Sequence, residues 1–121
     1  MTSAVFLISM GKGLREANWK DRLLYFLGRL RAFSVEGDSM LPTLKSGDTV
    51  LIDPNTKIEV GDIVLADHPY KSSIRVLKRV AEIEPSGDLI LVGDNAAEST
   101  DSRTFGAVSI ESIIGRVICR L

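Results

Sequence analysis

Turn-forming residues interrupt the chain at short intervals after residue 34, and this spacing limits the fold more than any other feature. Six groups rich in Gly, Asp, Pro, Asn and Ser begin at Gly37, Ser46, Asp53, Gly61, Pro85 and Gly93. The runs between them are β-branched and apolar, a composition typical of strands: Thr49–Ile52, Ile63–Leu65, Ile74–Ile83, Leu89–Val92 and Ile113–Ile118. The sequence therefore predicts a mainly β fold, either a compact barrel or a rolled sheet.

The segment before these runs has a helical pattern instead. Apolar residues recur there at three- and four-residue spacings, which is typical of an amphipathic helix: Trp19, Leu23, Phe26, Leu27 and Leu30. We expect this helix to extend from Leu14 to about Phe33. The chain is thus divided into an N-terminal arm with the helix, residues 1–34, and a β domain, residues 35–121.

Charge is distributed unevenly between these two parts. The whole chain of 121 residues has a net charge of −1, which gives no indication of nucleic-acid binding. Residues 1–34 carry +4, however, and the remainder carries −5. The basic helix over residues 14–33 has two interpretations: it packs on its own domain or a partner, or it makes peripheral contact with an anionic membrane surface.

The sequence also predicts the compartment and excludes some kinds of site. The apolar run at residues 4–10 is far shorter than the ~20 residues of a membrane-spanning helix, and it lacks the flanks of a signal peptide. We therefore expect a cytoplasmic protein. Cys119 and His68 are the single cysteine and the single histidine, so we expect no disulfide, no structural zinc and no cofactor, with Cys119 in the core.

Lys78 is the first candidate for a chemical role. Alternation along a strand places it on the same face as Val76 and Val80. Apolar neighbours disfavour the charged ammonium and lower its pKa, so that a neutral amine is available as a general base. A lysine whose amine reaches solvent along the sheet edge is the alternative that the alternation alone leaves open.

Ser39 is the second candidate, in the turn that begins at Gly37 and Asp38. A free serine is a poor nucleophile until a neighbouring base takes its proton, so Ser39 matters chiefly if Lys78 meets it in space. A third polar stretch, residues 93–106, contains Ser99, Asp101 and Arg103 and is either an ordered loop or a solvated one. His68 lies in a turn and is assigned no role.

Taken in order, three motifs resemble those of the type I signal peptidase family of Ser/Lys proteases: Gly37–Leu44, Leu77–Val80 and Gly93–Arg103, with Gly61–Val64 between the first two. The resemblance covers about residues 35–121. It implies the rolled β-sheet catalytic domain of that family and serine endopeptidase activity without a metal.

The same resemblance implies roles for individual residues. Ser39 is the nucleophile and its backbone N–H donates to the oxyanion, while Lys78 is the general base. Ser99 positions the lysine amine, and Asp101 with Arg103 braces the site. Some family members have a hydroxyl two residues before the nucleophile, where this chain has Gly37, so that this side-chain donor is absent.

The substrate expected from the resemblance is the precursor of a nickel superoxide dismutase. Small family members that process it share the stretch Asp67–Tyr70 before the lysine strand and an ending like residues 115–121. Two alternatives remain open: a signal peptidase recruited to membranes by the N-terminal arm to cut exported precursors, and an inactive module that binds peptides.

Overall fold

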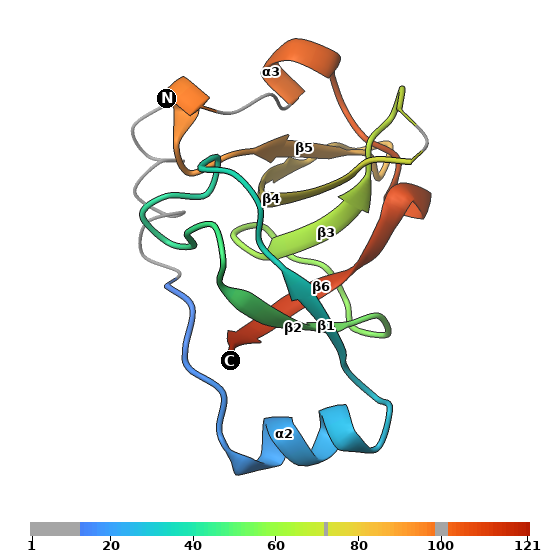
Figure 1. The fold of residues 1–121 in the computed structure, drawn as a ribbon. Coiled ribbons are helices and arrows are strands. Elements are labelled where there is room, and N and C mark those ends of the chain that lie inside the picture. Colours follow the sequence, from blue (N-terminus) through green and yellow to red (C-terminus); the bar gives the residue numbers. More distant parts are fainter. Residues whose placement is uncertain (1–12, 72, 99–101) are drawn as a thin grey trace.

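A single antiparallel sheet forms the body of the protein. The computed structural model describes residues 13–71, 73–98 and 102–121. Within these residues the sheet has six strands in the order β1-β2-β6-β3-β4-β5, and every pairing is antiparallel (Figure 1). The strands are β1 (Arg31–Ser34), β2 (Thr49–Asp53), β3 (Ile63–Asp67), β4 (Arg75–Ile83), β5 (Leu89–Val92) and β6 (Ile113–Arg120). The predicted mainly β fold is confirmed.

The last strand of the chain holds the two parts of the sheet together. β6 pairs with β2 on one side and with β3 on the other, so that Val50 lies opposite Arg120 and Val64 lies opposite Arg116. β1 and β5 remain as the two edges of the sheet. Figure 1 shows the strong twist that sets β1 and β2 across the direction of β4 and β5.

The hydrophobic core has one cluster on each face of the central strands. Along β3, Ile63 and Leu65 join one cluster, whereas Val64 and Ala66 join the other. β4 follows the same period of two, because Leu77 lies in the first cluster and Val80 in the second. Both faces of β3 and β4 are therefore buried, and a charged side chain on either strand needs a polar partner.

The N-terminal helix is shorter than predicted. Helix α2 (Trp19–Phe26) begins at Asn18, whose side chain accepts hydrogen bonds from the backbone N–H groups of Lys20 and Asp21. It ends at Leu27, and Gly28 follows with φ +78°, a conformation that favours glycine. Residues 31–34 then form β1, so the prediction of a helix from Leu14 to about Phe33 was wrong at both ends.

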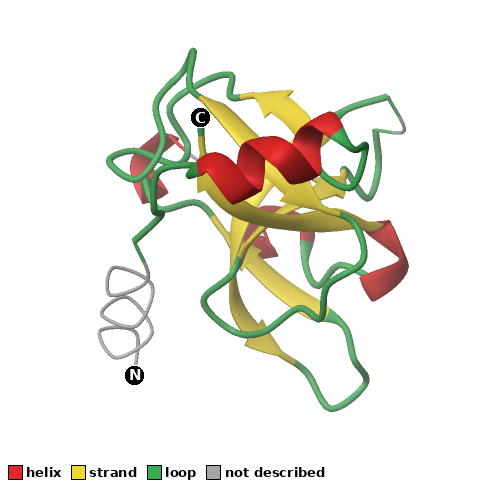
Figure 2. Cartoon of the chain, turned by 90° about the horizontal axis from the view of Figure 1, so that it is seen from below, coloured by secondary structure: helices red, strands yellow, loops and turns green. Residues whose placement is uncertain are grey.

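The helix packs on the sheet with an unexpected face. Leu24 contacts the buried cluster of Leu30, Leu51 and Cys119, and Figure 2 shows α2 lying across the strands. Asp21, which is 4% exposed, receives two hydrogen bonds from the guanidinium of Arg15. The helix therefore packs on its own domain, which was the first of the two interpretations. Most of the predicted apolar stripe, however, faces away from the sheet.

Two further expectations from the sequence concern the core and the membrane. Cys119 is fully buried, which confirms its predicted place in the core, and burial raises the pKa of its thiol. Among the described residues, no helix is long and apolar enough to cross a bilayer.

The remaining short helices are η1 (Ala96–Glu98), α3 (Ser102–Phe105) and η2 (Ile110–Ser112).

Gly115 on β6 is expected to tolerate no side chain. An added Cβ would lie 2.6 Å from the carbonyl oxygen of Asp53 and 2.7 Å from Cγ2 of Ile52, and the backbone atom cannot move aside. Gly115→Ala should lower the free energy of unfolding by about 1–3 kcal/mol. Gly13→Ala is the matched control, because no atom lies within 4 Å of its added Cβ. Urea denaturation measures both, and equal stability of the two variants would contradict this packing.

The ion pair between Arg15 and Asp21 should make stability depend on acidity. The Arg15 guanidinium lowers the pKa of Asp21 from 3.8 to about 2. The contribution of this ion pair to the free energy of unfolding is therefore fully present above the unfolded-state pKa of Asp21, and it is lost as the pH falls from about 4 to about 2. Arg15 is half exposed, so we expect about 1–2 kcal/mol. Asp21→Asn should remove this part of the pH dependence in denaturation curves; an unchanged slope would contradict the pairing.

Candidate functional site

Ser39 lies in the long connection between β1 and β2. Gly37, two residues earlier, has φ +78°, so the chain turns sharply just before the serine. The next residue, Met40, is 1% exposed and packs in the core with Leu44. Because the core holds both of these side chains, the backbone of Ser39 is fixed while its own side chain stays partly exposed.

Lys78 lies in the middle of β4, opposite Val64 of β3. It is 4% exposed although it carries an amine. The lysine therefore does not extend into solvent along the sheet edge, and that alternative from the sequence is wrong. A lysine is rarely buried to this extent, which makes Lys78 a candidate for chemistry rather than for solubility.

The structure places Ser39 and Lys78 on the same pocket, which has a volume of about 130 Å³. Its other lining residues come from β1, from the connection after it and from β4, and they are mostly apolar: Phe33, Val35, Glu36, Met40, Arg75, Val76 and Leu77. Two motifs far apart in the sequence thus meet at one cavity. A hydroxyl and a buried amine that line one pocket are the components of a Ser/Lys hydrolytic site.

The loop after β5 holds the serine turn in place. The backbone N–H of Asn95 donates to the carbonyl oxygen of Ser39 at 2.8 Å. The Asn95 side-chain amide donates to the carbonyl oxygen of Asp38 at 3.1 Å. The first and third motifs identified in the sequence are therefore joined through the backbone of the candidate nucleophile.

Next to this contact lies a buried ion pair that was not predicted from the sequence. The Arg79 guanidinium donates to both oxygens of Asp94, at 3.1 and 2.7 Å, and the two side chains are 1% and 2% exposed. Arg79 also donates to the carbonyl oxygen of Gly61 at 2.9 Å, and the Thr43 hydroxyl donates to Asp94 at 2.5 Å. One arginine thus connects β4, the loop before β3 and the loop after β5.

A signal for this pair was available in the sequence. Arg79 directly follows Lys78, and Asp94 stands in the Gly93-Asp94-Asn95 turn that was already part of the third motif. A run of alternating apolar residues around two adjacent basic ones predicts that at least one basic group is buried. A buried guanidinium needs a carboxylate, and bidentate pairing is the geometry that suits it.

The predicted supporting residues are only partly described. Ser99 and Asp101 lie outside the described residues. Arg103 is in α3, and its side chain is exposed. Their supporting roles therefore stay predictions, whereas the bracing contributed by Arg79 and Asp94 is observed.

His68 makes local contacts in the turn between β3 and β4. Its Nδ1 accepts a hydrogen bond from the backbone N–H of Tyr70 at 3.1 Å, and its ring lies 5.1 Å from that of Phe105 in α3. Tyr70 donates through its hydroxyl to the Phe105 carbonyl oxygen at 3.4 Å. The histidine is thus a packing residue between this turn and α3, and it is absent from the residues that line the Ser39 pocket.

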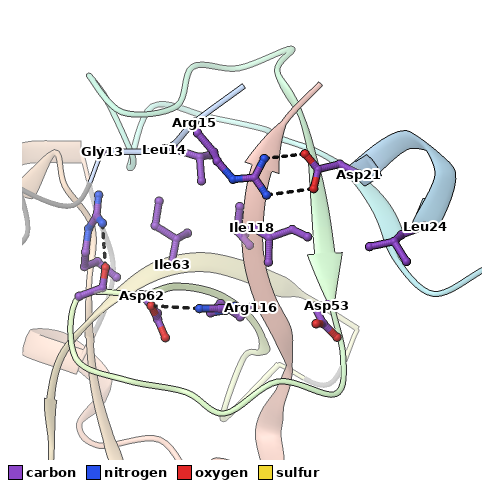
Figure 3. Close-up of a pocket in the computed structure, with 13 residues that line it drawn as sticks. Gly13, Leu14, Arg15, Asp21, Leu24, Asp53, Asp62, Ile63, Arg116 and Ile118 are labelled. Atoms are coloured by element: carbon purple, nitrogen blue, oxygen red, sulfur yellow. Dashed lines mark hydrogen bonds and ion pairs between the residues drawn. The ribbon is translucent and has the colours of Figure 1, made fainter. Parts of the chain in front are cut away.

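A larger pocket of about 550 Å³ lies between the segment before α2 and the strands (Figure 3). Its charged lining is largely paired: Arg15 with Asp21, and Arg116 with Asp62 at 4.0 Å. Neither Ser39 nor Lys78 lines it. The smaller pocket is therefore the candidate active site, because chemistry depends on the reactive groups and not on volume. Groups of acidic, cysteine or histidine side chains suited to a metal ion are absent from the described residues.

The chain is similar to known peptidases. Residues 12–118 match the model of the family described as Peptidase S24-like. The chain is 34% identical over 108 residues to mitochondrial inner membrane protease subunit 1 of Xenopus tropicalis, which covers 70% of this chain and 65% of that protein. It is 34% identical over 113 residues to the ATP-independent inner membrane protease subunit 1a of Arabidopsis thaliana, covering 72% and 67%.

A related subunit matches over a longer stretch. Mitochondrial inner membrane protease subunit 2 of Danio rerio is 33% identical over 121 residues, which covers 79% of this chain and 63% of that protein. The chain thus spans about two thirds of the length of these relatives. The family match, residues 12–118, spans the described residues that line the Ser39 pocket and those of the Arg79–Asp94 contact.

Removing Arg79 is expected to destabilise the fold strongly. Arg79→Met leaves the carboxylate of Asp94 buried with only the Thr43 hydroxyl as a side-chain donor among the contacts described, which should cost about 3–5 kcal/mol. Arg75→Met is the matched control on the same strand, since its side chain is 59% exposed and its contact with Asp67 is 3.9 Å long. We expect the control to cost less than about 1 kcal/mol. Thermal and urea unfolding compare the two, and similar losses would contradict the bracing role.

Proposed function

Because the chain belongs to the Peptidase S24-like family, we propose that it is a serine endopeptidase that works with a Ser39/Lys78 dyad. The observation that carries this proposal is that both residues line one pocket, with the amine buried and the hydroxyl on a fixed turn. Membership of a peptidase family and the order of the three motifs also support a Ser39/Lys78 dyad.

In the proposed reaction the neutral amine of Lys78 takes the proton of the Ser39 hydroxyl. The serine oxygen attacks the scissile carbonyl carbon, and the backbone N–H of Ser39 donates to the oxyanion that forms. The Lys78 ammonium then returns the proton to the leaving amine, and an acyl-enzyme remains. Water, deprotonated by the same lysine, hydrolyses the ester and restores the serine.

The surrounding residues keep this dyad in place. The bond from Asn95 to the Ser39 carbonyl oxygen fixes the serine turn against the loop after β5. In the proposal Ser99 orients the Lys78 amine, and Asp101 with Arg103 braces the same loop. Position 37 is glycine, so the oxyanion receives no side-chain hydroxyl from there.

The proposed substrate is the precursor of a nickel superoxide dismutase. The mature dismutase binds nickel through its N-terminal amine and histidine, and a leader peptide blocks that amine until it is removed. Proteolysis therefore creates the metal site, and the protease itself needs no metal. The likeness of residues 67–70 and 115–121 to the small enzymes that perform this cleavage supports the assignment. A cytoplasmic location is part of the same proposal.

The substrate is proposed to bind as an extended strand. β1 is an edge strand, and its Phe33 lines the same pocket as Ser39. Edge backbone groups hydrogen-bond to extended peptides, while the pocket accepts a side chain next to the scissile bond. A pocket of about 130 Å³ suits a small side chain.

A second candidate function is cleavage of exported precursors at a membrane. The observation that favours it is the similarity to proteins named as mitochondrial inner membrane proteases. Both candidates use the same dyad and differ in substrate. An inactive peptide-binding module is the remaining alternative, and it predicts no cleavage of either substrate.

The test is to mix the purified protein with nickel superoxide dismutase precursor and to read the new N-terminus by mass spectrometry. Wild type should cut directly before the ligand histidine. Ser39→Ala and Lys78→Met should stay folded and lose cleavage by at least about a thousandfold, since each removes one half of the dyad. A secretory precursor is tested in parallel.

Matched controls lie in the same connection between β1 and β2. Ser46→Ala and Lys45→Met change exposed residues outside the pocket, and both variants should cleave as wild type does. Cleavage by Ser39→Ala would contradict the dyad. Cleavage of the secretory precursor alone would favour the second candidate, and no cleavage of either substrate would favour the binding module.

A further inference from the structure

Helix α2 presents an exposed apolar face. Phe26 is 85% exposed and Trp19 69%, and Leu23 and Leu27 are also exposed. Residues 19, 23, 26 and 27 recur at helical spacing and therefore lie along one side of the helix. Figure 1 shows α2 at the end of the molecule opposite α3, where the helix stands apart from the loops of the candidate active site.

The exposure of this face is fixed by contacts on the opposite side of the helix. Leu24 packs against the cluster of Leu30, Leu51 and Cys119, and Asp21 receives the paired hydrogen bonds of Arg15. Turning the apolar face toward the sheet would break that ion pair and withdraw Leu24. The fold thus keeps two aromatic side chains in contact with water, which is unfavourable for apolar groups. Such exposure indicates that this face binds another surface.

The exposed charges of α2 and of the segment after it have one sign. Four basic side chains there are exposed: Lys20, Arg22, Arg29 and Arg31. The single acid between residues 17 and 35 is Asp21, which is buried and paired with Arg15. Exposed Glu16, just before α2, is paired with Arg120. The segment that carries the apolar face therefore adds positive charge to the surface.

From these observations we propose that α2 docks on an anionic lipid surface and lies parallel to the bilayer plane. Trp19 and Phe26 enter the boundary between headgroups and acyl chains, where aromatic rings are favoured, while the basic residues contact lipid phosphates. A second copy of the chain fits less well, because a symmetric contact through this face would bring two sets of like charges together.

The inference does not rest on peptidase activity, because binding is measured without a substrate. The full-length protein is mixed with vesicles of phosphatidylcholine alone, or of phosphatidylcholine and phosphatidylglycerol in equal parts, and separated by flotation at low and high salt. We expect binding to the anionic vesicles, weakened by about tenfold at high salt, and little binding to the neutral ones.

Two variants separate the apolar contribution from the charge. Trp19→Ser/Phe26→Ser and Arg22→Gln/Arg29→Gln should each weaken binding to anionic vesicles by about tenfold or more. Ile83→Ser/Ile110→Ser is the matched control, since it removes two exposed apolar side chains elsewhere and should bind as wild type does. Circular dichroism and thermal unfolding check that all variants are folded.

Three outcomes would overturn the proposal. One is equal binding of the wild type to neutral and anionic vesicles. Another is equal loss of binding in the control variant. The third is absence of binding to the anionic vesicles. If the wild type is then a dimer that Trp19→Ser/Phe26→Ser dissociates, the face is assigned to a second copy.

Discussion

The guanidinium of Arg79 and the carboxylate of Asp94 form an ion pair close to the turn that carries Ser39, and both groups are buried. Neither charge is tolerable there without the other, so strand β4 and the loop after β5 must come together in one register. Gly61 and Thr43 supply the remaining polar contacts of the pair. The neighbouring residue in each segment lies at the candidate site. Lys78, before Arg79, lines the Ser39 pocket, and the backbone N–H of Asn95, after Asp94, donates to the Ser39 carbonyl oxygen.

This arrangement places the candidate catalytic residues next to structural ones. A proposed nucleophile and base must be held in place by the residues around them. Pairing compensates the two buried charges of Arg79 and Asp94. The side chain of Met40, which packs in the core, fixes the serine turn. The pocket that Ser39 and Lys78 line has apolar side chains from β1 and β4 beside its charged ones. Helix α2, at the far end, is then free to present a different kind of surface.

Much of this could be predicted from the sequence, because local patterns specify most of the elements. The runs from Thr49, Ile63, Ile74, Leu89 and Ile113 all contain strands, and alternation correctly separated Leu77 from Val80. β1 was missed because Arg31–Ser34 has a mostly exposed pattern and is a strand only through its pairing with β2. The Arg79–Asp94 pair was missed because the alternation indicates that one of two adjacent basic residues is buried, but it does not show which carboxylate pairs with it across the fold. The orientation of α2 was missed since Asp21 and Leu24, rather than its apolar stripe, contact the sheet.

The central claim is that the amine of Lys78 is the base that activates Ser39. It is tested most directly by replacing Lys78 with cysteine and alkylating that thiol to an aminoethyl group, which restores an amine of lower pKa than lysine. The buried Cys119 should remain unmodified. The account predicts that Lys78→Cys is inactive, that aminoethylation restores cleavage, and that the acidic limb of the pH–rate profile moves to lower pH than in the wild type. Activity of unmodified Lys78→Cys, or rescue with an unmoved acidic limb, would contradict it.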